Sequence, residues 1–298
     1  MDPGRRADYA DFYDPADGPV ALVHGDCQAE SLRVVLAGSP TFPHRTVRMP
    51  PVHELTAADL PALHALLART RLLLSQPVRD DHRDLPLGTR QLAALLPADA
   101  QVLRWPVIRY AGLHPWSAIV RHTADRSLVP PAVPYHDLRT LAMAAGRPAP
   151  KEPADGAALR EATALSVSQL AHRERCDADV GVSDLLVGLG AAAAHTLDHP
   201  GNPVLVALAR RLQEAAGWPA DAPDPGRTLL GGIRSPLTAP VLAALDLDAP
   251  ERPHWTVDGR TVVEEAVREA QLAWYREHPA WIAAGLARHA DALRVLGL

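Results

Sequence analysis

Short apolar runs alternate with helically spaced segments through the first third of the chain. The runs long enough for buried strands are Val20 to Val23, Arg45 to Met49, Arg71 to Ser75 and Gln101 to Trp105. The segments between them that fit helices are residues 29–36, 56–69 and 88–96. Strands and helices that alternate at this spacing predict a parallel sheet of about four strands with helices against it.

Helical patterns dominate the second half of the chain. Segments rich in proline interrupt it at residues 117–134 and 146–153. Helices are predicted at residues 136–145, 156–172, 182–194, 202–216, 261–278 and 281–295, with Pro279 breaking the last pair. The expected fold class is therefore α/β and helix-rich, with an N-terminal parallel sheet followed by a mostly helical C-terminal half.

The expected domain organisation follows this change of pattern. Residues 1–19 carry Pro, Gly and Asp among a few aromatic residues, and they predict an irregular N-terminal arm. Residues 20–298 are expected to form a single folded unit, with an α/β part at 20–150 and a helical part at 151–298. The sequence shows no internal repeat and no low-complexity tract.

Charge and composition narrow the functional class. The 298 residues carry a formal net charge of −5, which leaves no broad basic surface and disfavours nucleic-acid binding. Cys27 and Cys176 are the only cysteines, too few for a disulfide framework, and they favour a reduced, cytoplasmic setting. The first residues lack the apolar segment of a secretory signal, and no run of about 18 apolar residues predicts a membrane span.

The first candidate for chemistry is Cys27, which follows a strand and a Gly turn at the start of a predicted helix. Gly25 allows a tight turn that residues with a Cβ resist. Unpaired N–H groups and the helix dipole favour an anion at a helix N-terminus, so they lower the pKa of a thiol there. Cys27 is therefore a candidate nucleophile or part of an anion cradle. The alternative is a small residue that fits a tight turn.

Two further polar segments follow predicted strands. In parallel α/β sheets, ligands bind outside the carboxyl ends of the strands. Ser75, Gln76 and Arg79 come after the third strand, where they can donate hydrogen bonds to a carbonyl, an oxyanion or a phosphate. Arg109 and His114 come after the fourth strand and flank a Gly turn, which suits phosphate or acyl binding. For the segment after the third strand, the alternative is a solvated polar loop. For His114, it is a structural role within its loop.

A histidine pair lies further along the chain. His195 and His199 are four residues apart, a spacing that suits a metal pair on a helix. Pro200 disfavours helical geometry at His199 and no Glu accompanies the pair, so we expect no metal site. His199 is the candidate general base, because histidine titrates near neutral pH, and loop anchoring is its alternative role. Asn202 fits a helix cap, with Pro203 at the first helical position.

Several of these segments resemble the motifs of one protein family. Residues 24–28, His-Gly-Asp-Cys-Gln, resemble the Gly-Asn-Cys-Gln signature that opens proteins of the WcbI family. Asp26 stands where the family commonly has Asn, and its carboxylate opposes thiolate formation at the adjacent cysteine. Residues 75–76 and 112–115 resemble the family's Ser-Gln and Gly-aromatic-His-Pro segments.

The resemblance continues in the second half. Residues 170–218 resemble the family's Arg-Glu, Ser-Asp and Asn-His-Pro blocks in the same order. Leu113 replaces an aromatic residue and Asp198 replaces an Asn of the family pattern. The resemblance thus covers roughly residues 20–218, and residues 219–298 carry no recognisable motif.

This resemblance implies a polysaccharide-biosynthesis enzyme that binds coenzyme A. The implied reaction moves an acyl group, such as acetyl, from coenzyme A to a hydroxyl or amine of a sugar or secondary metabolite. It implies catalytic roles for Cys27 and His199. The residues implied in coenzyme binding are His24, Gly25, Gln28, Ser75, Gln76, Arg79, Arg109, His114, His195 and Asn202.

The sequence leaves several alternatives open. One is a cysteine-dependent thioesterase or esterase, with water as the acceptor, and another is a non-catalytic coenzyme A or nucleotide binder. A covalent thioester on Cys27 and direct transfer both fit the motif. The expected partners are acyl-coenzyme A and a small-molecule acceptor, with no metal, no nucleic acid and no membrane span, and self-association into a homo-oligomer stays open.

Overall fold

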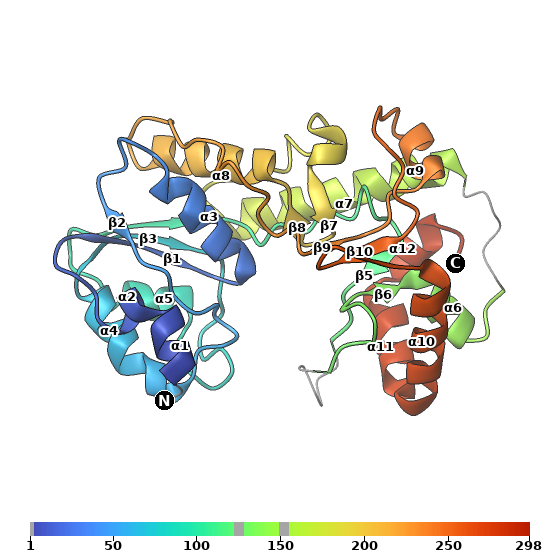
Figure 1. The fold of residues 1–298 in the computed structure, drawn as a ribbon, viewed down its shortest axis with the longest axis horizontal. Helices are drawn as coiled ribbons and strands as arrows, with labels where there is room; N and C mark the ends of the chain where they lie inside the picture. The colour runs from blue at the N-terminus through green and yellow to red at the C-terminus, as the bar shows by residue number, and fades with distance from the viewer. Residues whose placement is uncertain (1–2, 122–127, 149–154) are drawn as a thin grey trace. The chain divides into compact units, whose positions relative to one another are not determined.

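The computed structural model describes residues 3–121, 128–148 and 155–298 (Figure 1). Its residues form two compact units, and each is described by itself. Unit 1 lies within Met1–Ile108, Leu170–Leu185 and Gly201–Leu230, and unit 2 within Arg109–Gln169, Leu186–Pro200 and Gly231–Leu298. Segments of the two units alternate along the chain. The sequence instead predicted a single change, from an α/β part to a helical part, near residue 150. The expectation of one folded unit over residues 20–298 stays a prediction.

Unit 1 is built on the predicted parallel sheet. Its four strands, in the order β2-β1-β3-β4, are β2 (Arg45–Thr46), β1 (Val20–His24), β3 (Thr70–Ser75) and β4 (Gln101–Arg104). All neighbouring strands pair in parallel, with His24 opposite Ser75 and Ser75 opposite Arg104. The carboxyl ends of β1, β3 and β4 therefore meet at one edge of the sheet, which confirms the α/β prediction.

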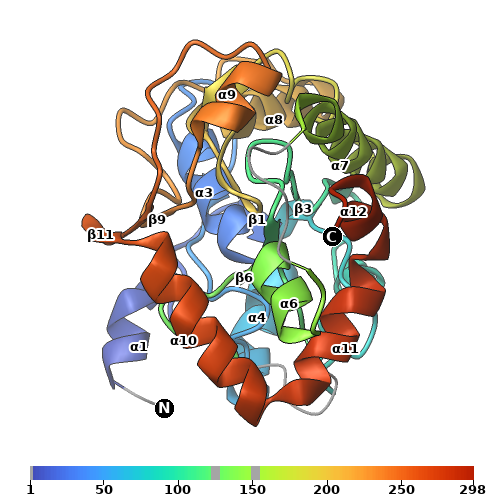
Figure 2. The same ribbon diagram turned by 90° about the vertical axis from the view of Figure 1, so that its right-hand side faces the viewer.

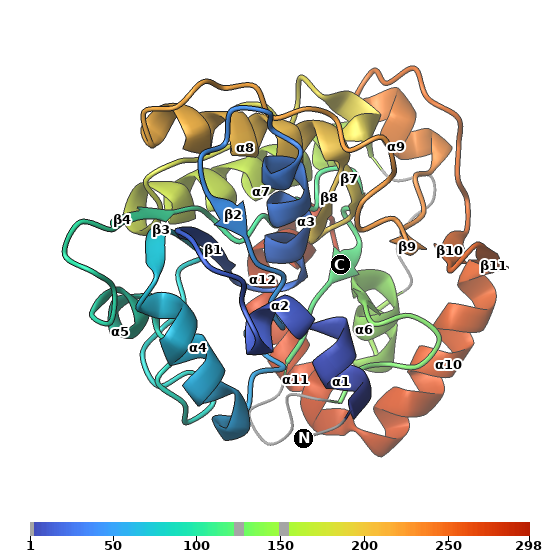
Figure 3. The ribbon, with the colours of Figure 1, turned by 60° about the vertical axis from the view of Figure 1, so that its left-hand side comes forward.

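Helices cover both faces of this sheet (Figures 1 and 3). α3 (Cys27–Ala37) and α8 (Asn202–Ala215) lie on one face and pack against each other. The short 3₁₀ helix η1 (Ala57–Asp59) leads into α4 (Leu60–Leu67), which lies on the other face together with α5 (Thr89–Ala93). Because both faces are covered, all five residues of β1 are buried.

The N-terminal arm is helical, which corrects the expectation of an irregular segment. It forms α1 (Pro3–Asp8) and α2 (Ala10–Tyr13). The Tyr13 hydroxyl donates a hydrogen bond to Asp59 Oδ1 at 2.6 Å, and Arg5 donates to Asp59 Oδ2 at 3.2 Å. Tertiary anchoring of two short helices thus outweighs the helix-breaking composition of this segment.

Unit 2 combines helices with small antiparallel sheets. Its described strands are β5 (Ser117–Ala118), β6 (His136–Asp137), β7 (Ala194–Thr196), β8 (His199–Pro200), β9 (Ile233–Arg234), β10 (Trp255–Val257) and β11 (Arg260–Val262). They pair as β5-β6, β7-β8 and β11-β10-β9. Its short helices are η2 (Gly190–Ala192), α6 (Leu138–Ala144), α9 (Ala239–Ala244) and α12 (Ala290–Val295). Such two- and three-residue strands leave almost no periodic signal, so the sequence did not predict them.

The longer C-terminal helices form a separate core of unit 2. α10 (Glu264–Glu277) and α11 (Pro279–Arg288) pack against α6, as Figure 2 shows. The buried side chains between them include Leu141, Trp274 and Trp281. Pro279 lies at the start of α11, so the helix break predicted there is confirmed.

The helix predicted at residues 182–194 is wrong. α7 (Gly156–Asp177) runs further than predicted, and turns follow it up to η2. The Glu174 carboxylate accepts hydrogen bonds from the backbone N–H groups of Val182 at 2.8 Å and Ser183 at 3.0 Å. These bonds tie residues 182–183 to the last turns of α7, and such contacts between side chain and backbone are invisible to local periodicity.

Candidate functional site

Cys27 is the first residue of α3, directly beyond the carboxyl end of β1 in unit 1. Asp26 is the N-cap, and its Oδ1 accepts a hydrogen bond from the backbone N–H of Gln28 at 2.9 Å. Cys27 is partly exposed. The predicted strand, turn and helix are confirmed, and they place the thiol where a helix favours negative charge.

The side chain of Gln76 holds this turn in place. Its Oε1 accepts from the backbone N–H of Asp26 at 2.8 Å, and its Nε2 donates to Asp26 Oδ1 at 3.1 Å. The backbone N–H of Gln76 donates to the carbonyl of His24 at 2.8 Å. We call these bonds between Gln76 and residues 24–26 the turn clamp. Because Gln76 is 2% exposed, its contribution at this site is to position the turn.

Gln28 makes a second pair of amide bonds. Its Nε2 donates to the carbonyl of Ile108 at 2.9 Å, and its Oε1 accepts from the backbone N–H of Ile108 at 3.0 Å. Gln28 is fully buried. The side chain therefore ties the first turn of α3 to the segment that follows β4.

Ser75 and His24 are also buried at the strand ends. The Ser75 hydroxyl donates to the carbonyl of Gln76 at 2.7 Å and lies 3.0 Å from Thr89 Oγ1. His24 Nε2 lies 3.1 Å from the carbonyl of Leu87, so its neutral ring donates from Nε2. Burial lowers the pKa of His24 to about 4. Both side chains bond to protein groups and support the turn clamp from within unit 1.

Arg79 differs from these buried residues. Its side chain is exposed, and within the described chain it forms no ion pair and no hydrogen bond. A free guanidinium beyond the carboxyl end of β3 suits a ligand phosphate. Of the candidate residues in unit 1, Arg79 is thus the exposed cation.

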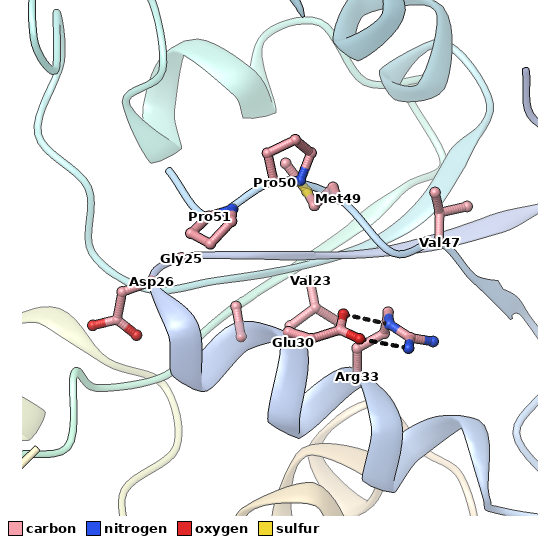
Figure 4. A pocket seen from close by; sticks show the side chains of 10 residues that line it. Val23, Gly25, Asp26, Glu30, Arg33, Val47, Met49, Pro50 and Pro51 are labelled. Carbon is pink, nitrogen blue, oxygen red and sulfur yellow. Dashed lines mark hydrogen bonds and ion pairs between the residues drawn. The ribbon is translucent and has the colours of Figure 1, made fainter. Parts of the chain in front are cut away.

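A small pocket flanks the turn on the side of α3 (Figure 4). Its lining residues are Val23, Gly25, Asp26, Ala29, Glu30, Arg33, Val47, Met49, Pro50 and Pro51. Glu30 and Arg33 form a two-bond ion pair, with distances of 2.7 and 2.8 Å. The backbone N–H of Val52 donates to the carbonyl of Gly25 at 2.8 Å and holds the apolar wall against the turn. The pocket thus combines an apolar wall with one charged pair.

The other candidate histidines belong to unit 2. His195 lies on β7 and His199 on β8, so the pair sits on a hairpin and not on a helix, as Pro200 indicates. The backbone N–H of His199 donates to Thr196 Oγ1 at 3.1 Å. Among the described residues, no group of three or more His, Cys, Asp or Glu side chains is arranged to hold a metal ion.

A tyrosine lies beside the His199 hairpin. The Tyr135 hydroxyl donates to Asp198 Oδ1 at 2.7 Å, and the rings of Tyr135 and His199 meet edge to face with centroids 6.4 Å apart. Tyr135 also stacks on Trp255 with centroids 5.5 Å apart. The aromatic wall restricts where the His199 ring can lie.

Arg109 and His114 also lie in unit 2, in the segment before β5. His114 is 3% exposed and its Nδ1 lies 2.9 Å from the carbonyl of Pro236. Burial lowers the pKa of His114 to about 4, so the ring is neutral at pH 7 and donates from Nδ1. Arg109 is half-buried.

Asn202 does not cap α8, which corrects one sequence expectation. Gly201 is the N-cap residue, and it carries no side chain that could accept a hydrogen bond. Asn202 Nδ2 donates to the carbonyl of Arg227 at 2.8 Å, and its Oδ1 accepts from the backbone N–H of Leu229 at 3.0 Å. Asn202 therefore fastens the 227–229 loop to the start of α8 in unit 1.

Sequence reasoning missed the supporting partners of the site. Thr89 Oγ1 donates to the carbonyl of Gln76 at 2.8 Å and accepts from Val78 N at 3.0 Å, and Leu87 and Ile108 contribute backbone groups. Backbone groups leave no trace in residue type. The spacing of Asp26 one residue before a helix was the available signal for its capping role.

Fold and site together define an α/β protein with a cysteine at a helix N-terminus, at the carboxyl edge of a parallel sheet. A family model described as "Polysaccharide biosynthesis enzyme WcbI" matches residues 20–221, so the chain belongs to the WcbI family of polysaccharide-biosynthesis enzymes. No curated protein matches the chain.

A solved structure has a similar fold. It superposes with a TM-score of 0.78 at 20% sequence identity, over 94% of this chain and 97% of that chain. It is described as "Structural insights into WcbI, a novel polysaccharide biosynthesis enzyme", in a native form without a disulfide bond between COA and one of its cysteines. At this identity the likeness shows the fold. In the described part of this chain, no helix is both long and apolar enough to cross a membrane.

The variant Gly25→Ala is expected to lower the free energy of unfolding by about 1–3 kcal/mol, as overpacking of buried sites does. An alanine Cβ would lie 2.4 Å from Gln76 Oε1 and 2.7 Å from its Cδ, so the turn clamp has to open. Urea unfolding monitored by circular dichroism measures the change.

Gly156→Ala is the matched control for this variant. Its Cβ meets no atom closer than 3.6 Å, and alanine favours the helix that begins there. Equal stability of Gly25→Ala and the wild type would show that the turn accommodates a Cβ without opening the clamp.

Proposed function

We propose that this enzyme binds acyl-coenzyme A and transfers its acyl group to a hydroxyl or amine of a sugar or secondary metabolite. The observation that carries the proposal is the clamped turn that presents Cys27 at the N-terminus of α3. Membership of the WcbI family and the mention of COA for the similar solved structure support it.

The proposed coenzyme site draws on residues of different character. The exposed guanidinium of Arg79, together with Arg109, supplies positive charge for the coenzyme's phosphates. His24, Gln28, Ser75 and Gln76 are buried and bonded to protein groups, so they act by shaping the turn. The other residues proposed for this site are Gly25, His114, His195 and Asn202.

A covalent route is the first of two mechanisms. The Cys27 thiolate attacks the thioester carbonyl of acyl-coenzyme A, a new bond forms between Sγ and the acyl carbon, and the bond to the coenzyme sulfur breaks. The released coenzyme thiolate takes up a proton. The acceptor hydroxyl then attacks the acyl-Cys27 thioester while His199 accepts its proton, and the acyl ester and a free Cys27 thiol result.

Direct transfer is the second mechanism. The acceptor oxygen or nitrogen attacks the coenzyme thioester itself, His199 accepts the proton, and the coenzyme leaves as its thiol. Cys27 then serves only to position the donor. The Asp26 carboxylate beside the thiol favours this route, because a nearby negative charge raises the pKa of a thiol.

The variant Cys27→Ser separates the two routes. A thioester needs sulfur, so on the covalent route the variant loses most of its activity, whereas on the direct route it keeps rates within a few-fold of the wild type. On the covalent route the variant keeps its coenzyme affinity. Cys176→Ser is the control, because Cys176 is exposed on α7. Chromatographic measurement of coenzyme A released from acetyl-coenzyme A, with and without a panel of sugar acceptors, gives the rates.

The same assay tests the function itself. Release that depends on an acceptor supports a transferase. Release without any acceptor indicates a thioesterase, and binding without release indicates a coenzyme binder. No shift of the melting temperature at millimolar coenzyme A or acetyl-coenzyme A would rule out a coenzyme site, since a ligand far above its Kd stabilises the folded state.

A further inference from the structure

Two arginines of unit 2 lie on paired antiparallel segments beyond the residues matched by the family model. Arg234 is on β9 opposite Thr256 of β10, and Arg252 lies opposite Leu237 in the continuation of the same antiparallel pair. Backbone bonds of 2.7 and 2.9 Å between Leu237 and Arg252 fix this register. We call Arg234 and Arg252 the arginine pair.

The arginine pair has no counter-ion. Among the described residues neither guanidinium forms an ion pair with a carboxylate, and the single side-chain hydrogen bond runs from Arg252 Nε to the carbonyl of Ser235 at 2.7 Å. Burial and the neighbouring charge of Arg234 lower the pKa of Arg252. Two like charges held together in a partly buried place cost free energy unless an anion joins them.

Two histidines lie near the arginine pair and bring no negative charge to it. Burial is the largest cause that lowers the pKa of His114 to about 4, and the charge of Arg252 and the neighbouring His195 also lower it, so the ring is neutral at pH 7. The strand segment that carries Arg234 is tied to both histidines. The Ser235 backbone N–H donates to the His195 carbonyl at 2.8 Å, and His114 Nδ1 donates to the Pro236 carbonyl at 2.9 Å.

The hydrogen bond of Arg252 also shows where its side chain lies. Its Nε reaches the backbone carbonyl of Ser235, the residue that follows Arg234, so the Arg252 side chain lies against the segment that carries Arg234. The nearby acids do not neutralise the site, because Glu251 caps the backbone N–H of Ala239 at 3.0 Å and forms no ion pair with either arginine.

We propose that the arginine pair forms an anion-binding site of unit 2 that takes a phosphate group of a small-molecule ligand. Two guanidinium groups match the charge of a phosphate dianion and offer it several directed N–H donors. The phosphate can belong to an acceptor, such as a sugar phosphate, or to the coenzyme, and both sources share this chemistry. The site goes beyond the proposed acyl transfer and does not depend on it.

Titration calorimetry of the full chain with inorganic phosphate, glucose 1-phosphate and coenzyme A tests the site. The variants are Arg234→Gln and Arg252→Gln, and the control is Arg268→Gln on α10, an arginine that pairs with Glu265. We expect Arg234→Gln to weaken phosphate binding by roughly tenfold or more, as loss of a charge-assisted contact does. The control should bind phosphate like the wild type.

The titrations with glucose 1-phosphate and with coenzyme A identify the source of the phosphate. Weakened binding of glucose 1-phosphate with unchanged coenzyme affinity assigns the site to the acceptor, and the reverse result assigns it to the coenzyme. Without ligand, Arg234→Gln should melt at or above the wild-type temperature, because it relieves repulsion and breaks no hydrogen bond of the described chain. Phosphate affinity that is unchanged in both variants, or absent in the wild type, overturns the proposal.

Discussion

Replacing His199 with alanine is expected to lower kcat of acyl transfer by about 10²–10⁴-fold, the contribution of a single general base. Coenzyme affinity should stay near the wild-type value, because the proposed role of His199 is to take a proton from the acceptor. The His199 backbone is fixed by its bond to Thr196, and β8 keeps this bond in the variant, since it uses a main-chain donor. The loss therefore reports on the imidazole and not on an altered hairpin.

His172→Ala is the matched control. It removes the same imidazole ring, and His172 is exposed on α7. Acetyl-coenzyme A turnover with a saturating acceptor, measured from pH 6 to 9, gives both kcat and its pH profile. If kcat of His199→Ala stays within a few-fold of the wild type, another group accepts the proton. His24 and His114 would then be the next histidines to test, although each already uses a ring nitrogen on a backbone carbonyl.

Acid should unfold this protein at a pH where ordinary carboxylates are still charged. Burial is the largest cause that lowers the pKa of His24, His114 and His136 to about 4, from an ordinary value of 6.5. Between these two values the unfolded chain binds protons that the folded chain does not. Stability is thus complete above pH 6.5 and falls as the pH is lowered toward 4.

The expected size of this effect is large. Each histidine contributes a slope of about 1.4 kcal/mol per pH unit inside the window, and the three together give about 4 kcal/mol per pH unit. Since total stabilities are about 5–15 kcal/mol, we expect substantial unfolding by about pH 4.5. Urea midpoints at pH 7.5, 6 and 5, followed by circular dichroism, measure the slope.

Two checks separate the buried histidines from other titrating groups. Asp59 and Asp179 have lowered pKa values, so their contribution is lost only below the histidine window. The exposed His172→Gln variant should show the same pH slope as the wild type. A free energy of unfolding that stays constant from pH 7.5 to 5 would mean that these rings can charge inside the folded chain.

The part of the fold that the sequence predicts is the part with strong periodicity. The buried strands β1 and β3 each contain a continuous apolar run, and α3 repeats its apolar positions at helical spacing, so all three elements were predicted with nearly correct ends. β2 is shorter than expected, because the chain leaves the sheet after Thr46, and Val47 and Met49 line the pocket instead. Local pattern cannot show where a strand loses its partner.

In the candidate site, too, the features set by local spacing were predicted and the features set by distant contacts were not. The position of Cys27 at a helix N-terminus depends on local spacing, and it was predicted. The roles of Gln76 and Gln28 depend on partners 50 and 80 residues away, and no local pattern carries such information. The arginine pair was missed for the same reason, since Arg234 and Arg252 meet only through an antiparallel pairing of very short strands.

The bond between Gln28 and Ile108 also bears on how sequences of this fold can diverge. Gln28 binds both peptide groups of position 108, and the Ile108 side chain takes no part in these bonds. These two bonds therefore require only a backbone N–H at position 108, which proline lacks, while burial of the side chain, 1% exposed, keeps the position apolar. At position 28 even glutamate is unsuitable, because it lacks the donor. Position 28 thus needs one particular side chain, whereas position 108 can exchange one apolar side chain for another, so two residues in direct contact can diverge at very different rates.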